Sequence, residues 1–307
     1  GVQRGLRGLI DTGVTVLLAG LLTAASGLLK MQRASLQSRP VMVRWYYMCM
    51  AFFVLGALVG ASMASHSVGG LDDPLSTHLT LMFGGWLGCA IVGTLHTLFP
   101  SITATRLRWP RLEVPTYWLW VTGVTILAGG YALGTTVAVA VGWYLLLSAA
   151  SLLLANISAT ARSGSLRNVP ALFVTAAQLC LLVALLIAVV AVSTDPTASF
   201  SAAQRAAVGT LLLFGWIAMT VAGALTRLLS VVGRVRNLEL APPRIGLHPL
   251  VIALTTAALL LLASAQLAGL DQLWSVAAIA LVVSYAATAE RVLALAIHAL
   301  RVARVRL

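Results

Sequence analysis

The chain of 307 residues has very few charged side chains, since Asp, Glu, Lys and Arg together make up 9% of it. Hydrophobic residues make up 60%, and the mean hydropathy is +0.98. A soluble domain carries about a quarter charged residues. The composition therefore excludes an ordinary soluble protein and predicts one that is embedded in a lipid bilayer.

Buried charge and catalytic motifs are scarce as well. None of the eight acidic residues falls at the midpoint of an apolar run, and such a charge usually marks an ion path or proton relay. A proton-coupled pump is therefore disfavoured.

The absence of a phosphate-binding loop, an HExxH pair and a nucleophile–base arrangement argues against hydrolysis and phosphoryl transfer. The three cysteines form no CxxC or CxxCH motif, so we expect free thiols, without structural disulfides or covalently attached haem.

Nine apolar segments are long enough to cross a bilayer. About 20 residues at a rise of 1.5 Å span the ~30 Å hydrocarbon core, and the need to satisfy backbone polar groups internally selects helices. The segments are residues 8–29, 43–64, 77–99, 117–136, 138–158, 170–193, 206–230, 249–269 and 273–296. We predict an all-α fold, a polytopic transmembrane bundle of about nine helices forming one integral membrane domain over residues 1–307.

The net charge of +12 is concentrated in alternate connections between these segments. Basic residues follow the first, third, fifth, seventh and ninth segments, whereas the other connections carry little positive charge. By the positive-inside rule this pattern predicts a multi-pass protein of the cell membrane with a cytoplasmic C-terminus and an outside N-terminus. The expected partner of the protein is the lipid bilayer, and nucleic acid is not expected. Because the chain begins with Gly1, we expect that residues precede it.

The segment 78–100 is partly repeated 130 residues later. The positions that match are Gly85, Trp86, Gly93, Leu95 and Leu98, and their counterparts are Gly215, Trp216, Gly223, Leu225 and Leu228. The histidines are not repeated, since Val208 and Thr226 stand where the first copy has His78 and His96. We predict an internal repeat whose third and seventh helices run parallel, with His78 as the first candidate for function.

Glycines at helical spacing predict close helix contacts. Gly56 with Gly60, and Gly84 with Gly88, form GxxxG pairs, and glycines recur every seven residues at positions 13, 20 and 27. Small residues at such spacing let helix backbones approach each other. These glycines predict tight packing and no chemistry.

Ligand-type side chains gather where the second predicted helix ends and the third begins. Met63, His66, His78 and Met82 combine imidazole with thioether, which suits Cu(I), and His/Met ligation also suits haem iron. Asp72 and Asp73, in the intervening loop, are candidates to orient the imidazoles. The alternative is that His78 caps a helix and the methionines fill space.

His96 is a further candidate ligand on the opposite side of the membrane. It lies 18 residues after His78, or about 27 Å along a helix, so the two cannot share one metal.

Two runs of the sequence resemble a known family. VRWYYMCMAFFVLGALVGASMA, an acidic loop, and THLTLMFGGWLGCAIVGTLHTLFPSITATRLR are similar to the N-terminal membrane portion of actinobacterial multicopper-oxidase-like proteins, some of them related to copper nitrite reductases. The matching positions are Arg44, Tyr46, Tyr47, His78, Gly85, Trp86, Gly93, Thr94, Leu95, Pro100, Thr103, Thr105 and Arg106. The resemblance implies a membrane module that works with a cupredoxin or multicopper oxidase domain outside the membrane, and these 307 residues contain no cupredoxin copper motif.

A more distant similarity is to subunit I of the haem-copper oxidases. There a helix of the form His…Gly…Gly…Pro carries a haem ligand, and the matching position here is His78. Those oxidases need further histidines on partner helices, which this sequence does not show. The reduction of oxygen or nitric oxide within this domain is therefore not expected.

Together these observations predict the membrane module of a redox system, and at most the membrane part of an oxidoreductase. It would bind haem or copper near the outer face through His78, with His66, Met63 and Met82, and would anchor or supply electrons to a copper oxidase or reductase. One alternative is a structural membrane subunit without a cofactor. The other is a metal-ion permease, which the Met/His group favours and the uncharged midplane disfavours.

Overall fold

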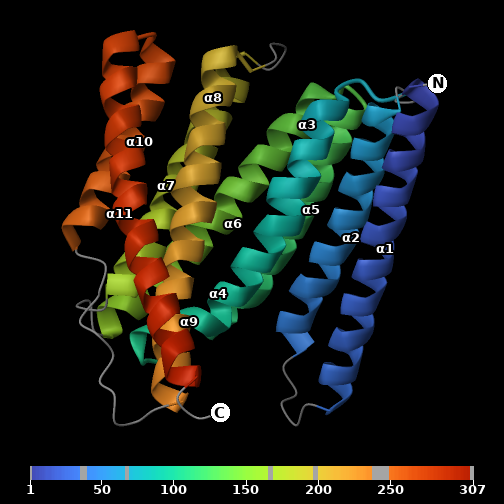
Figure 1. Cartoon of the computed structure of the whole chain (residues 1–307). Helices are drawn as coiled ribbons and strands as arrows, with labels where there is room; N and C mark the ends of the chain where they lie inside the picture. The colour runs from blue at the N-terminus through green and yellow to red at the C-terminus, as the bar shows by residue number, and fades with distance from the viewer. Residues whose placement is uncertain are drawn as a thin grey trace. The chain divides into compact units, whose positions relative to one another are not determined.

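The computed structural model describes residues 2–34, 40–65, 69–164, 169–195, 200–236 and 249–304. Within these ranges the chain forms nine continuous helical stretches and no β-strand (Figure 1). They are α1 (Val2–Ala34), α2 (Pro40–Ala64), α3 (Pro74–Leu79) continuing through η1 (Thr80–Leu87) into α4 (Gly88–Thr103), α5 (Glu113–Ala132), α6 (Thr136–Ser163), α7 (Val169–Thr194), α8 (Ala202–Thr210) continuing through η3 (Leu211–Ala218) into α9 (Met219–Arg236), α10 (Pro249–Ala268) and α11 (Asp271–Arg304), with a short 3₁₀ turn, η2 (Pro110–Leu112), before α5. The predicted all-α fold is confirmed.

Eight of the nine stretches are long and apolar enough to cross a membrane, which makes the chain a multi-pass membrane protein. The exception is α5, which begins at Glu113 and includes several polar and aromatic residues. Nine of its residues are buried, among them Tyr117, Trp120 and Val124. These residues pack α5 against α3 and η1 within unit 1.

The acidic loop before α3 sets the start of that helix. The Asp73 carboxylate accepts a hydrogen bond from the Ser76 backbone N–H at 2.9 Å, and Pro74 follows as the first helical residue. Both features favour a helix start. The Asp73 carboxylate therefore caps the helix that carries His78. The backbone N–H groups of Asp72 and Asp73 donate to carbonyls at the end of α5, which ties the loop to a second helix.

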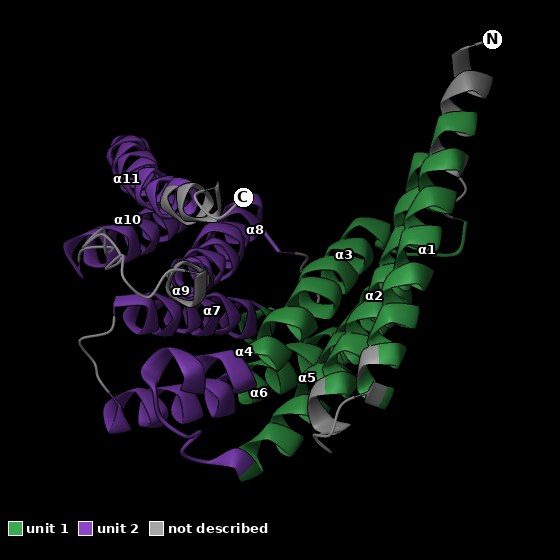
Figure 2. Ribbon diagram, turned by 60° about the horizontal axis from the view of Figure 1, so that its bottom comes forward, with its two compact units in different colours: residues 1–96, 111–149, 192–197 green, residues 97–110, 150–191, 198–307 purple. Residues whose placement is uncertain are grey.

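The chain divides into two compact units (Figure 2). Unit 1 comprises Gly1–His96, Arg111–Ala149 and Val192–Thr197, and unit 2 comprises Thr97–Pro110, Ala150–Ala191 and Ala198–Leu307. Each unit has one helix that packs against a long helix with a π-helical middle. We call the interface of α2 with α3, η1 and α4 the α2 seam, and the interface of α7 with α8, η3 and α9 the α7 seam.

The α2 seam is built from glycines that face large side chains on the opposite helix. A Cβ atom on Gly85 would lie 2.5 Å from the Cβ of Phe52, and one on Gly93 would lie 2.5 Å from the Cβ of Trp45. Real Cβ atoms do not approach so closely, so the two helices meet at this distance only because both positions are glycine. Of the predicted GxxxG pairs, Gly56 and Gly60 lie against the side chains of Met82 and His78, whereas Gly84 and Gly88 lie against Val124 and Trp120 of α5.

The α7 seam repeats this arrangement in unit 2. A Cβ on Gly215 would lie 2.6 Å from the Cβ of Cys180, and one on Gly223 would lie 3.2 Å from the Cβ of Phe173. Cys180 and Phe173 are seven residues apart on α7, as Phe52 and Trp45 are on α2. The internal repeat that the sequence predicts for one helix therefore includes the helix that packs against it.

A π-helical segment occupies the same place in both copies. In η1 the Gly84 carbonyl accepts a hydrogen bond at 2.9 Å from the indole N–H of Trp120 on α5. In η3 the Phe214 carbonyl accepts one from the Tyr285 hydroxyl on α11. Each carbonyl directly precedes the Gly-Trp pair of its copy. Interrupted α-helical bonding is frequent at functional sites, and here a neighbouring helix satisfies the backbone.

The glycines of α1 differ from those of the seams. Nothing lies within 4 Å of a Cβ built on Gly13, Gly20 or Gly27. The close contact predicted at this glycine series is therefore not formed within the described part of the chain. The helix is held to α2 elsewhere, and the Tyr47 hydroxyl donates a hydrogen bond at 2.8 Å to Oε1 of Gln32.

Candidate functional site

His78 is half-buried in α3 and is oriented by α2. Its Nδ1 lies 2.8 Å from the Gly56 carbonyl oxygen. A carbonyl oxygen only accepts hydrogen bonds, so the Nδ1–H of His78 is the donor. In the neutral imidazole the lone pair is then on Nε2. Histidines that bind metals through one ring nitrogen typically donate the other N–H to a backbone carbonyl or carboxylate.

The room for His78 and Met82 comes from the GxxxG pair of α2. A Cβ on Gly60 would lie 2.9 Å from Cε1 and 3.2 Å from Nδ1 of His78. A Cβ on Gly56 would lie 2.7 Å from the sulfur of Met82. Each glycine thus makes space for one ligand-type side chain. The two glycines, and the two side chains opposite them, are one helical turn apart.

The matched positions of the α7 seam show what packing alone requires. Cys180 on α7 matches Phe52 on α2, because each faces the glycine of its Gly-Trp pair. With this alignment, Ala188 and Ala184 match Gly60 and Gly56. Opposite them the second copy has Val208 and Leu212 in place of His78 and Met82. Ala184, Val208 and Leu212 belong to one apolar core cluster. These two positions of the seam therefore pack without histidine or methionine.

Two further candidate ligands, Met63 and His66, were predicted for the site at His78. Met63 is half-buried in the last turn of α2, three residues beyond Gly60. His66 lies outside the described residues. Among the described residues, no group of three or more His, Cys, Asp or Glu side chains is close enough together to hold a metal ion. A metal at His78 would therefore depend on methionine sulfur, or would be a haem iron.

His96 lies in a different environment, deep in α4. Its Nδ1–H donates to the Val92 carbonyl at 2.8 Å, one turn back on its own helix. Its ring stacks on Trp45 with the centroids 6.0 Å apart. His96 Nε2 and Trp45 Nε1 are both buried and have no hydrogen-bond partner among the described residues. The matched Thr226 likewise bonds back to its own helix, through the Gly223 carbonyl at 2.8 Å. The structure does not bring His96 together with His78.

The cysteines are free and buried, as the sequence predicts. Sequence reasoning missed that two of them lie between the same pair of helix contacts on the α2 seam. Cys49 on α2 and Cys89 on α4 lie one turn from the Gly85–Phe52 contact and one turn from the Gly93–Trp45 contact. The GxxxG spacing could have revealed the pair only if the register between the helices had been known.

In unit 2 the tryptophan of the repeat, Trp216, belongs to a buried hydrogen-bond network. The indole N–H of Trp216 donates to Oε1 of Gln178 at 3.0 Å, and Nε2 of Gln178 donates to the Thr220 hydroxyl at 3.1 Å. The matched residue of unit 1 is Met50, and the matched Trp86 instead packs against Phe53 with ring centroids 4.7 Å apart. A buried indole N–H is usually hydrogen-bonded, and Gln178 supplies the partner of Trp216 in the second copy.

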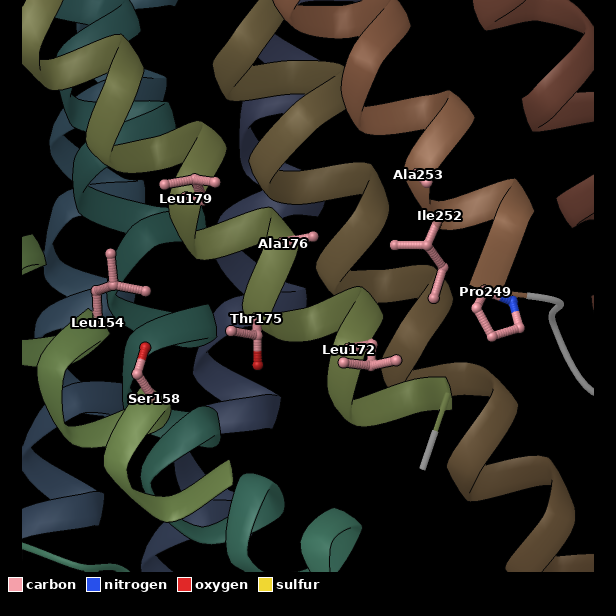
Figure 3. A pocket seen from close by; sticks show the side chains of 9 residues that line it. All are labelled: Leu154, Ser158, Leu172, Thr175, Ala176, Leu179, Pro249, Ile252 and Ala253. Carbon is pink, nitrogen blue, oxygen red and sulfur yellow. The ribbon is translucent and has the colours of Figure 1, made fainter. Parts of the chain in front are cut away.

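An apolar pocket of about 430 Å³ lies among α6, α7 and α10 of unit 2 (Figure 3). Its polar groups are the hydroxyls of Ser158 and Thr175, and the latter donates to the Ala171 carbonyl at 2.8 Å. None of the described residues that line it is titratable. The candidate functional site is therefore the α2 seam and not this pocket.

The fold and the seam define the class of the protein, a multi-pass helical membrane protein with an internal repeat. No protein-family model, curated protein or solved structure matches the chain.

Proposed function

We propose that the chain is the membrane module of a redox system and that His78 binds haem or copper. One observation carries the proposal. The Nδ1–H of His78 is engaged by the Gly56 carbonyl at 2.8 Å, which leaves Nε2 as the ligand atom, and Gly60 clears the space beside the ring. The second copy packs the same seam with Val208 and Ala188, so a purely structural role does not require this arrangement.

The donor set suits two groups. Haem iron takes an axial imidazole alone or with a thioether, and Cu(I) takes imidazole and thioether together. His78 would supply the imidazole, and Met82 or Met63 the thioether. Either group would supply one-electron transfer when bound. The protein would hold the imidazole in one tautomer and orientation through Gly56, and would keep water out through the close packing of α2.

We infer that the His78 end of the seam lies at the outer face of the cell membrane. The opposite end of the same long helix is followed by Arg106, Arg108 and Arg111, and the positive-inside rule places such residues in the cytoplasm. This orientation puts the N-terminus of the chain outside and the C-terminus inside. A cofactor at the outer face could exchange electrons with a cupredoxin or multicopper oxidase partner there, as the family resemblance implies.

A reduced-minus-oxidised visible spectrum of the detergent-purified protein, with metal analysis of the same sample, tests the proposal. The variants are His78→Ala and, as a matched control on the same helix, His96→Ala. We expect a haem band, or about one copper per chain, that is lost in His78→Ala and kept in His96→Ala. Folded protein with neither haem nor copper would overturn the proposal and leave the structural subunit. Copper uptake by proteoliposomes that is lost in Met82→Ala would favour the permease instead.

A further inference from the structure

We propose that Cys49 and Cys89 form a second soft-metal site, which binds one Cu(I) ion between their two sulfur atoms in the middle of the α2 seam. The site is distinct from His78, and the inference does not depend on His78 carrying a cofactor.

The position of the pair follows from the contacts on either side of it. Gly85 meets Phe52 and Gly93 meets Trp45, each with a built Cβ only 2.5 Å from the partner's Cβ. Cys89 on α4 lies midway between Gly85 of η1 and Gly93 of α4, and Cys49 lies between the two aromatic residues on α2. On both helices the intervening residue shares the face of its neighbours, because steps of three and four residues stay on one face. The two thiols therefore face each other where the helices come closest.

Burial isolates the pair from other ligands. Cys89 is fully buried and Cys49 is 8% exposed, and both thiols are free. Within the described ranges no third His, Cys, Asp or Glu joins them to form a metal-binding group. Zn²⁺ prefers four ligands. A site of two sulfurs in apolar surroundings suits Cu(I) better, because thiolates select this soft ion. On binding, each thiol releases its proton, and the oxidation state of the metal does not change.

The second copy again shows that packing does not require the pair. The matched positions of the α7 seam are Ala177 and Met219, both fully buried. Cys180, the cysteine of unit 2, packs against Gly215 and has no thiol opposite it. The α7 seam thus has a thioether and a thiol of its own, but no pair of cysteines at the matched positions.

The test is an anaerobic Cu(I) titration of the full chain in detergent against bicinchoninate, a Cu(I) chelator. It uses the His78→Ala protein, in which copper cannot bind to the His78 imidazole. The titration therefore reports binding at the cysteines independently of the proposed site at His78. Cys49→Ala and Cys89→Ala are introduced in turn, with Cys180→Ala as the matched control. Alanine is the residue of the second copy at the position of Cys49, and thermal unfolding of each variant verifies that it folds.

We expect one chelator-resistant equivalent of Cu(I) in the parent and in Cys180→Ala, and none in Cys49→Ala or Cys89→Ala. X-ray absorption of the bound copper should show two sulfur ligands. The proposal is overturned if the single variants keep the ion or if Cys180→Ala loses it equally. A Cys49–Cys89 disulfide in protein isolated anaerobically would also overturn it, because the sulfurs would then be bonded to each other.

Discussion

A methyl group at Gly60 tests directly whether the α2 seam is shaped around His78. In Gly60→Ala the new Cβ would lie 2.9 Å from Cε1 and 3.2 Å from Nδ1 of His78. The ring cannot move away freely, because its Nδ1–H is bonded to the Gly56 carbonyl at 2.8 Å. Relief of the clash therefore displaces the imidazole and breaks that hydrogen bond.

The magnitude follows from three opposing terms. Loss of the hydrogen bond costs about 1 kcal/mol, and overpacking costs about 1–3 kcal/mol. The higher helix propensity of alanine offsets up to about 1 kcal/mol. We expect a net destabilisation of about 1–3 kcal/mol, together with loss of any cofactor that Nε2 of His78 holds.

The second copy supplies the control. The double variant Gly60→Ala/His78→Val recreates the pair that Ala188 and Val208 form on the α7 seam. Its thermal unfolding temperature should return toward that of the wild type, which corresponds to a coupling of about 1–3 kcal/mol between the two positions. The reasoning is refuted if Gly60→Ala leaves the unfolding temperature unchanged, or if the double variant is no more stable than the single one.

Two further predictions concern the buried hydrogen bonds of the repeat. Trp120→Phe removes the donor to the Gly84 carbonyl of η1 and should lower the free energy of unfolding by about 1–3 kcal/mol; an unchanged denaturation midpoint would contradict the assignment of that bond. Gln178→Met, which installs the residue that unit 1 has at Met50, leaves the Trp216 indole N–H without its partner at 3.0 Å and should cost about 1–3 kcal/mol. Adding Trp216→Phe should recover most of that loss in a chemical-unfolding assay, and no recovery would speak against the network.

The helices were predictable because a bilayer imposes a simple rule on composition. Apolar runs of sufficient length must be helical, and the nine segments read from the sequence correspond to the nine helical stretches within the described residues. The helix ends extend beyond the apolar runs, as at α6 (Thr136–Ser163), because polar residues such as Arg162 continue a helix once it has left the hydrocarbon.

Contacts between helices were predictable only in part. The matching glycines around Trp86 and Trp216 indicate the repeat, but whether each tryptophan is buried depends on the residue opposite it. Trp216 is 1% exposed and its indole N–H donates to Gln178, whereas Trp86 is only half-buried and packs against Phe53. The facing of Cys49 and Cys89 depends on helix register, which a single sequence does not specify. The π-helical segments were also missed, because their residue types are those of ordinary membrane helices.

The central claim is that Nε2 of His78 is a ligand, and chemical rescue tests it most directly. His78→Gly removes the imidazole and leaves a space beside Gly60 into which free imidazole can bind. The haem or copper signal of the purified protein should be absent in this variant and should return when imidazole is added. A signal that survives the substitution, or that imidazole fails to restore in a variant shown to be folded, would contradict the account.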